Sequence, residues 1–309
     1  MKHPENKKNE GIPQNANLIL MGGGTYVGTA RPMLEFGVNL ANKPEPTVLL
    51  IATPKIDKKI FNETVKNATE LFQNMGAAVC LLHEFETMPS DTEISEKIDS
   101  SDVIYITGGS TVHALEQWRR YGVDAKLSDA MRQGKIITGM SAGAIPWFAE
   151  GLTDSAHYDP QADEEWDFGT IEGINHIDTF VTPHFDSMKT PDSQKRSIHF
   201  ASALVRKSQE TGRPEFGLGM DNNAGLLAVD GLVRIITTRA TSTLHVVRAE
   251  PSGEFTITDL KAPTVQVSEG HTSISQIGDE GISWEDFYAQ LSEPTRSPQV
   301  VASVSSKVS

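Results

Sequence analysis

The residues best suited to chemistry lie in Ile136-Ile137-Thr138-Gly139-Met140-Ser141-Ala142-Gly143-Ala144, where an apolar run leads into Gly-x-Ser-x-Gly. This pattern is typical of a nucleophile elbow, a sharp turn between a strand and a helix that lifts a serine hydroxyl out of a sheet. Small residues flank Ser141 because such a turn is tight, and the N–H of Ala142 would face an oxyanion. The alternative is a glycine-rich turn that carries an ordinary serine.

A second glycine pair offers the other oxyanion donor. Thr107-Gly108-Gly109-Ser110-Thr111 also follows an apolar run, and glycines let a backbone approach a ligand closely. The N–H of Gly109 or Gly108 is well placed to complete an oxyanion hole with Ala142. Ser110 or Thr111 is also suited to cap a helix, and the two roles are compatible.

A general base is expected in Val181-Thr182-Pro183-His184-Phe185-Asp186, because His184 comes directly after a short apolar run. An imidazole with a pKa of about 6.5 can accept a serine proton at neutral pH. The chain has nine histidines, so other imidazoles compete for the role. These rivals are His113, His157, His176, His199 and His245.

The third member of a catalytic triad is expected at Asp221, in Gly219-Met220-Asp221-Asn222-Asn223-Ala224-Gly225. Its carboxylate could accept a hydrogen bond from the second imidazole nitrogen, although Asp-Asn-Asn is equally typical of a plain turn. Asp154 and Ser155 form a further polar pair after the nucleophile. The aromatic residues that could wall the pocket, or simply fill the core, are Trp147, Phe148, Trp166 and Phe168.

Several other functions are disfavoured. The segment Gly22-Gly23-Gly24-Thr25-Tyr26-Val27-Gly28 lacks the spacing of a dinucleotide fingerprint and the lysine of a phosphate-binding loop. The His, Asp and Glu pairs of residues 154–186 lack the spacing of a metal site, and Cys80 is the only cysteine. A formal net charge of -14 repels nucleic acid and anionic membranes, so neither is an expected partner.

The first half of the chain alternates short apolar runs with amphipathic stretches, which predicts a parallel α/β sheet with both faces covered. The expected strands are Asn17–Met21, Thr47–Ala52, Ala77–Leu82, Val103–Thr107 and Lys135–Thr138. The expected helices between them are Ala30–Leu40, Lys58–Asn74, Glu93–Asp99, Val112–Tyr121 and Asp124–Gln133. Because ligands bind beyond the carboxyl ends of such strands, that edge is the expected functional edge.

The second half has a different pattern. A polar and aromatic loop over residues 154–173 is expected to cover the active edge. The expected elements are a strand at Phe180–Thr182, a helix at Ser193–Lys207 and a terminal helix at Ile282–Leu291. Several antiparallel strands are expected between Phe216 and Val247, joined at Asp230-Gly231 and near Arg239–Thr243.

We expect one catalytic domain with extensions. The expected divisions are a flexible N-terminal tail at 1–16, an α/β hydrolase domain at 17–250, a C-terminal extension packed on it at 251–292 and a disordered tail at 293–309. The polar N-terminus has no secretory signal and no apolar run could span a bilayer, so the expected location is the cytoplasm.

The motifs together resemble peptidase E, the aspartyl dipeptidase family related to cyanophycinase, over roughly residues 17–235. The resemblance rests on the order of Gly-Gly-Ser-Thr at 108–111, Gly-Met-Ser-Ala-Gly-Ala at 139–144, Trp147-Phe148 followed by Asp154-Ser155, and Pro183-His184-Phe185. It implies a mostly parallel sheet flanked by helices, like class I glutamine amidotransferases with serine in place of cysteine, and antiparallel strands in the C-terminal third. It also implies hydrolysis of short peptides with an N-terminal aspartate, without a cofactor.

The resemblance also implies roles for residues. Ser141 matches the nucleophile, His184 the base, and Gly109 with Ala142 the oxyanion positions. The family commonly has an acid, often glutamate, in the turn aligned with residues 220–223, whereas here Asn222 follows Asp221. We therefore expect Asp221 to be the acid, with Asp154 in reserve. Gly108, Asp154 and Ser155 are candidates for substrate binding, and the cations that could meet a substrate carboxylate, unless they are only surface charges, are Lys189, Lys195 and Arg196.

Other functions stay open at this point. A cyanophycinase-like hydrolase of β-aspartyl-arginine would use the same triad, and a non-catalytic binding protein could keep the scaffold. An α/β-hydrolase esterase shares Gly-x-Ser-x-Gly, but its histidine follows the acid, whereas His184 precedes Asp221. The expected partner is a short peptide substrate, and the sequence leaves a homo-oligomer open.

Overall fold

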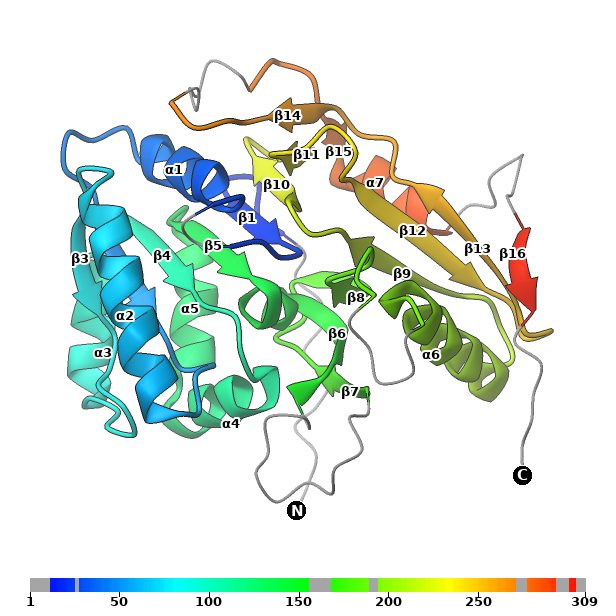
Figure 1. Ribbon diagram of the computed structural model, residues 1–309, viewed down its shortest axis with the longest axis horizontal. Coiled ribbons are helices and arrows are strands. Elements are labelled where there is room, and N and C mark those ends of the chain that lie inside the picture. Colours follow the sequence, from blue (N-terminus) through cyan, green and yellow to red (C-terminus); the bar gives the residue numbers. More distant parts are fainter. Residues whose placement is uncertain are drawn as a thin grey trace.

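The computed structural model describes residues 12–25, 28–155, 168–188, 194–270, 277–292 and 300–303. Within these residues the strands form two sheets: the first runs from the left to the upper centre of Figure 1, and the second from the lower centre to the right. Residues 1–11, most of the loop expected at 154–173, Lys189 and most of the C-terminal tail lie outside the described residues.

The first sheet is built on five parallel strands, and their positions confirm the expected apolar runs. They are β1 (Asn17–Met21), β2 (Thr47–Ile51), β3 (Ala78–Leu81), β4 (Val103–Ile106) and β5 (Ile136–Met140). The described sheet has the order β14-β11-β10-β1-β5-β4-β2-β3, with β15 also paired to β11. The strands added beside β1 are β10 (Ala224–Val229), β11 (Leu232–Thr237), β14 (Thr264–Gln266) and β15 (Ile282–Ser283).

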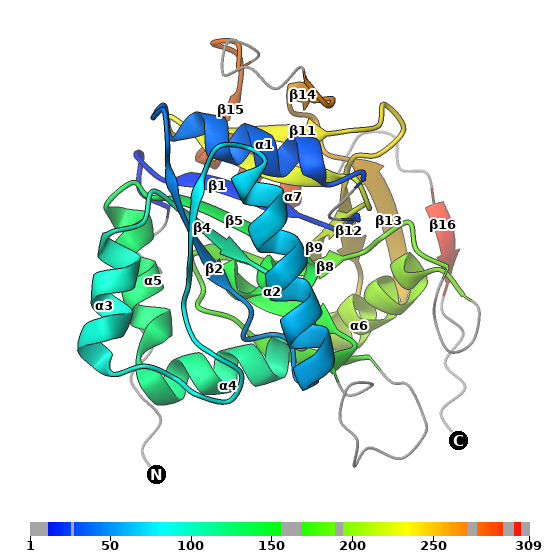
Figure 2. The ribbon, with the colours of Figure 1, turned by 60° about the vertical axis from the view of Figure 1, so that its left-hand side comes forward.

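Both faces of this sheet are buried. Along β1, Leu18 and Leu20 face one hydrophobic cluster while Ile19 and Met21 face another, as a strand's two-residue period requires. One face is covered by α1 (Arg31–Leu40) and α2 (Lys58–Gln73), and the other by α3 (Asp91–Asp99), α4 (Thr111–Tyr121) and α5 (Val123–Arg132) (Figure 2). Ser110 accepts a hydrogen bond from the N–H of His113 at 3.2 Å, so the expected helix cap is confirmed.

After Ser141 the chain leaves the first sheet. The helix expected there is absent, because Ser141–Gly143 and Ile145–Trp147 form two 3₁₀ turns. Pro146 explains the difference, since it has no N–H and its ring would clash within a regular α-helix that began at Ser141. The chain then enters β6 (Phe148–Thr153), the first strand of the second sheet.

The second sheet was not expected as a separate layer. Its described order is β16-β13-β12-β9-β8-β6-β7, with β6, β8 and β9 parallel. The strands expected between Phe216 and Val247 are shared, since β10 and β11 extend the first sheet while β9 and β12 belong to the second. The remaining elements are β7 (Gly169–Glu172), β8 (Ile177–Pro183), α6 (Arg196–Thr211), β9 (Glu215–Met220), β12 (Leu244–Ala249), β13 (Glu254–Asp259), α7 (Trp284–Ser292) and β16 (Val300–Ser303).

The C-terminal part pairs with both sheets. β13 continues the second sheet, β14 and β15 lie on β11, and β16 pairs with β13 where a disordered tail was expected. The valine-rich sequence at 300–303 suits an edge strand. None of the described helices combines the length and the apolar character that crossing a bilayer requires.

We expect Arg234 to tie residues 278–280 to the first sheet. Its buried guanidinium donates to the carbonyls of Glu280 at 2.6 Å, Gly278 at 3.0 Å and Val229 at 3.3 Å. Arg234→Leu removes all three hydrogen bonds, and a hydrogen bond from a charged donor contributes about 1.5–3 kcal/mol. The free energy of unfolding in urea should therefore fall by several kcal/mol, whereas Arg213→Leu, at an exposed site, should change it little. Equal stability of the two variants would contradict this assignment.

Candidate active site

Ser141 lies on a strained turn at the carboxyl end of β5. Its φ is 55°, in the left-handed region that a residue with a side chain rarely adopts. A Cβ on Gly139 would lie 2.3 Å from the carbonyl oxygen of Gly143, and one on Gly143 would lie 2.4 Å from that of Ile106. Both glycines of the motif are therefore required by close backbone contacts, as a nucleophile elbow demands.

His184 meets this serine from the other sheet. The Ser141 Oγ and His184 Nε2 atoms are 2.5 Å apart, and His184 directly follows β8. Of the rival imidazoles, His176 bonds to Ser128, His245 lies between two aspartates, and His199 packs on a phenylalanine ring. His113 lies on α4 and His157 is outside the described residues.

Asn222, and not Asp221, faces the second imidazole nitrogen. The Asn222 Oδ1 atom is 2.9 Å from His184 Nδ1. The carboxylate of Asp221 instead accepts from the N–H of Thr243 and from His245 Nε2, each at 3.1 Å. The expected contact between His184 and Asp221 is therefore corrected: the two neighbouring side chains leave the turn after β9 in different directions.

The glycines after β1 also belong to this site, and their position at a strand end was the one signal that could have identified them. A Cβ on Gly23 would lie 2.4 Å from both His184 Nδ1 and Asn222 Oδ1. The bare backbone at Gly23 therefore gives these two side chains room to meet. The requirement is steric and differs from the backbone–phosphate contact of a nucleotide-binding loop.

The expected oxyanion positions lie beside the nucleophile. A Cβ on Gly108 would be 3.8 Å from Ser141 Oγ, and Gly109, with φ 143°, lies so close to Pro54 that a Cβ would be 2.2 Å from its carbonyl oxygen. In the part of the chain that the structure describes, neither the N–H of Gly109 nor that of Ala142 donates to a backbone carbonyl. Both N–H groups are thus available to a developing negative charge.

Asp154 and Ser155 have other partners. The Ser155 Oγ atom accepts from the N–H of Thr111 at 2.9 Å and so helps to satisfy the first turn of α4. Asp154 forms an ion pair of 3.1 Å with the buried guanidinium of Arg196, whose Nε also donates to Thr182. Asp154 therefore takes no part in the hydrogen bonds of His184 that the structure describes.

Burial lowers the pKa of His184 below its ordinary value, and the positive charge of Arg196 lowers it further. The hydrogen bond with Asn222 and the charges of Asp154 and Asp186 act in the opposite direction. The net effect favours a neutral imidazole, which is the form that can take a proton from Ser141.

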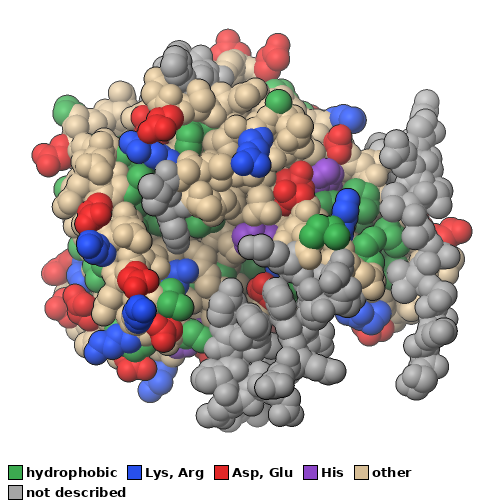
Figure 3. Space-filling model, viewed as in Figure 1, with side chains coloured by type: hydrophobic (Ala, Val, Ile, Leu, Met, Phe, Trp, Pro, Cys, Tyr) green, Lys and Arg blue, Asp and Glu red, His purple; other side chains and the backbone are tan. Residues whose placement is uncertain are grey.

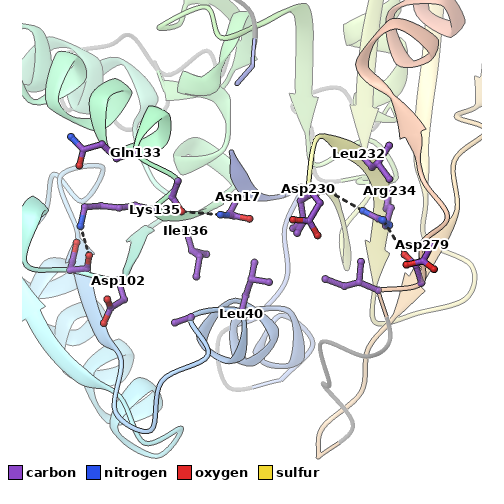
Figure 4. A pocket seen from close by; sticks show the side chains of 16 residues that line it. Asn17, Leu40, Asp102, Gln133, Lys135, Ile136, Asp230, Leu232, Arg234 and Asp279 are labelled. Carbon is purple, nitrogen blue, oxygen red and sulfur yellow. Dashed lines mark hydrogen bonds between the residues drawn. The ribbon is translucent and has the colours of Figure 1, made fainter. Parts of the chain in front are cut away.

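A cavity of about 590 Å³ lies away from this site, among the amino ends of the parallel strands (Figure 4). Its polar groups are held by the fold: Asn17 donates to the carbonyl of Gly134, Lys135 to those of Asp99 and Ser101, and Arg234 to that of Gly278. On the face shown in Figure 3, Lys and Arg side chains lie scattered among Asp and Glu. Neither feature competes with the Ser141 site as a place for chemistry.

A serine on a strained elbow, an imidazole within hydrogen-bond distance and two available N–H groups define the class of serine hydrolases. The family model of Peptidase family S51 matches residues 18–236. Because this match spans most of the chain, the chain belongs to peptidase family S51 and is a serine-type peptidase.

Curated relatives and solved structures agree with this assignment. "Uncharacterized peptidase YgaJ" of Bacillus subtilis is 27% identical over 176 residues, which are 56% of this chain and 70% of that protein. "Uncharacterized peptidase PM1590" of Pasteurella multocida is 26% identical over 172 residues, which are 56% of this chain and 79% of that protein.

Two crystal structures share the fold. A peptidase from an acI-B1 actinobacterium superposes with a TM-score of 0.57 at 16% identity, over 80% of this chain and 95% of that chain. A putative peptidase E protein from Listeria monocytogenes gives a TM-score of 0.52 at 20% identity, over 72% of this chain and 99% of that chain. The expected α/β architecture, of the class I glutamine amidotransferase type, is confirmed.

Gly23→Ala tests the steric part of the site. The new methyl group must displace His184 or Asn222, and a misplacement of about 1 Å can cost about 100-fold in rate. We expect kcat/KM on a cleavable peptide to fall by about that factor with little change in melting temperature. Gly169→Ala is the matched control, since its new methyl group would meet no atom within 4 Å. Full activity in Gly23→Ala would refute the proposed packing.

Proposed function

We propose that this chain hydrolyses short peptides, in particular dipeptides with an N-terminal aspartate, through an acyl-enzyme on Ser141. The observation that carries the proposal is the 2.5 Å contact between Ser141 Oγ and His184 Nε2 on the strained elbow. We place the reaction in the cytoplasm, whose reducing conditions suit the free thiol of Cys80.

The proposed reaction uses the site as follows. His184 Nε2 takes the proton of Ser141 as the hydroxyl attacks the peptide carbonyl, and the Nδ1 proton is held by Asn222. The N–H groups of Gly109 and Ala142 stabilise the oxyanion. His184 then gives the proton to the leaving amine, and water releases the acyl group in a second step.

Arg196 supports the preference for an acidic substrate. Of the three cations named from the sequence, Lys189 is not described, Lys195 is exposed at the start of α6, and Arg196 is buried. The charge of Arg196 acts on His184, so its positive potential reaches the reacting groups. A substrate carboxylate that entered the site would share this charge with Asp154.

Ser141→Ala should abolish the activity. Without the nucleophile, kcat for an Asp-Leu dipeptide should fall by at least about 10⁴-fold while the melting temperature is retained. Ser252→Ala, in an exposed turn, is the control and should cleave at the wild-type rate. Retained turnover in Ser141→Ala would remove the proposed function.

A substrate panel separates the alternatives. We expect Asp-Leu to be cleaved with a higher kcat/KM than Leu-Leu, because only Asp-Leu carries a side-chain carboxylate. We expect it to exceed β-Asp-Arg as well, because the ammonium group lies next to the scissile carbonyl in an α-peptide and one carbon further away in the β-peptide. Preference for β-Asp-Arg would instead indicate the cyanophycinase-like activity. Loss of labelling by an active-site serine reagent in Ser141→Ala, against clear labelling of the wild type, would exclude a non-catalytic protein.

The pH profile should reflect the lowered pKa of His184. The base works only when neutral, and its pKa lies below the ordinary value of about 6.5. The acid limb of kcat/KM should therefore have its midpoint below pH of about 6.5, so that activity persists into mildly acidic solution. A midpoint at or above that value, measured on Asp-Leu between pH 4 and 9, would contradict the assigned environment of His184.

A further inference from the structure

The third member of the proposed triad is a neutral amide, and an amide has two unlike ends. Only Oδ1 of Asn222 can accept a proton from His184 Nδ1, because Nδ2 is a donor. With the amide turned over, Nδ2 would face the ring and favour the tautomer that carries its proton on Nε2. That proton would point at Ser141, and the imidazole could not act as its base. A carboxylate would not have this difficulty, since both of its oxygens accept.

Asp186 supplies the group that decides between the two orientations. Its Oδ1 atom accepts from the Asn222 backbone N–H at 2.9 Å and from Asn222 Nδ2 at 2.8 Å. A carboxylate oxygen cannot donate, so it attracts the Nδ2 end and repels the Oδ1 end of the amide. The contact thereby directs Oδ1 towards His184.

The backbone around Asn222 and Asp186 is held by hydrogen bonds. The orientation of the Asn222 amide is what remains for Asp186 to control. On one side of Asn222, Asp221 donates its N–H to the carbonyl of Thr243, and on the other Asn223 donates to that of Gly23. Asp186 itself lies between His184 and Ser187, which share a backbone hydrogen bond of 3.0 Å. Both partners of the contact are thus held by main-chain bonds, while the Asn222 side chain can still rotate about its last bond.

We propose that Asp186 is a positioning residue of this peptidase: it anchors the Asn222 amide and so sets the tautomer of His184. The proposal rests on the proposed function, and it assigns to Asp186 a role separate from that of an acid in contact with the imidazole. The charged groups that act on His184 are Arg196, Asp154 and Asp186 itself, so the ring has charges of both signs around it.

A double-mutant cycle tests the proposal. Asp186→Ala should lower kcat on Asp-Leu by about 10- to 1,000-fold with KM within about twofold, since a wrong tautomer costs up to about 10⁴-fold in a serine protease. In the Asn222→Asp background, the same Asp186→Ala change should leave kcat unchanged or raise it. The carboxylate at 222 needs no orientation, and the change removes a like charge beside it.

The cycle separates positioning from a merely structural role. A structural loss would appear in both backgrounds, so equal losses in the two backgrounds, or no loss in the wild-type background, would overturn the proposal. The double variant should also show an acid limb of kcat/KM at higher pH than the wild type, because an anion then touches the imidazole. Asp178→Ala, at an exposed position, is the matched control and should keep wild-type kcat.

A measurement without substrate keeps this test independent of the proposed function. Nitrogen-15 NMR of His184 in the resting protein should show the proton on Nδ1 in the wild type and a substantial Nε2–H population in Asp186→Ala. Unchanged tautomers in the variant would overturn the inference even if Ser141→Ala proves inactive. Turnover retained by Ser141→Ala would refute the proposed function and leave the tautomer result to stand by itself.

Discussion

The hydrogen bond between Ser141 and His184 joins two sheets. It can form only if the rest of the structure holds the two sheets at a fixed position relative to each other. Ser141 directly follows β5 of the first sheet, whereas His184 directly follows β8 of the second. One continuous hydrophobic cluster includes Ile106 from the first sheet and Val181 and Met220 from the second. Because packed interiors deform little, this shared core fixes the distance between Ser141 and His184.

Close backbone approach is the second constraint at this junction. Gly139 allows close contact with the backbone of Gly143 within the elbow, and Gly143 allows close contact with the backbone of β4. Gly23, after β1, leaves room for the side chains of His184 and Asn222. These positions lie at the carboxyl ends of adjacent strands, where an open α/β sheet places its ligands. The steric requirement accounts for glycine-rich sequence in a site that binds no phosphate group in the proposed reaction.

The sequence was informative where burial acts on both faces of one strand or helix. Apolar runs predicted β1 and β4 within a residue, and the Gly-x-Ser-x-Gly spacing predicted the elbow at Ser141. It could not show that β9 and β12 leave the first sheet, because the pairing partner of an antiparallel strand is decided by distant parts of the chain. The expectation of a helix after Ser141 was wrong because it did not take account of Pro146.

The same limit explains the third member of the site. Asp221 has the better chemistry for the role, yet the direction in which each side chain leaves a turn depends on tertiary contacts such as the bond to Thr243. Ser155 likewise had the chemistry of a substrate ligand and serves α4 instead. Residue type identified the candidates, and only the folded backbone could assign their partners.

In the turn after β9, the adjacent side chains of Asp221 and Asn222 point in different directions, and each contacts a different histidine. The carboxylate of Asp221 contacts His245, which also contacts Asp259, while the amide of Asn222 contacts His184. A one-residue shift that brought Asp221 into the place of Asn222 would put the negative charge beside His184 instead of beside His245. The register of this short turn, as well as the identity of its side chains, therefore decides which of the two imidazoles has a carboxylate as its partner.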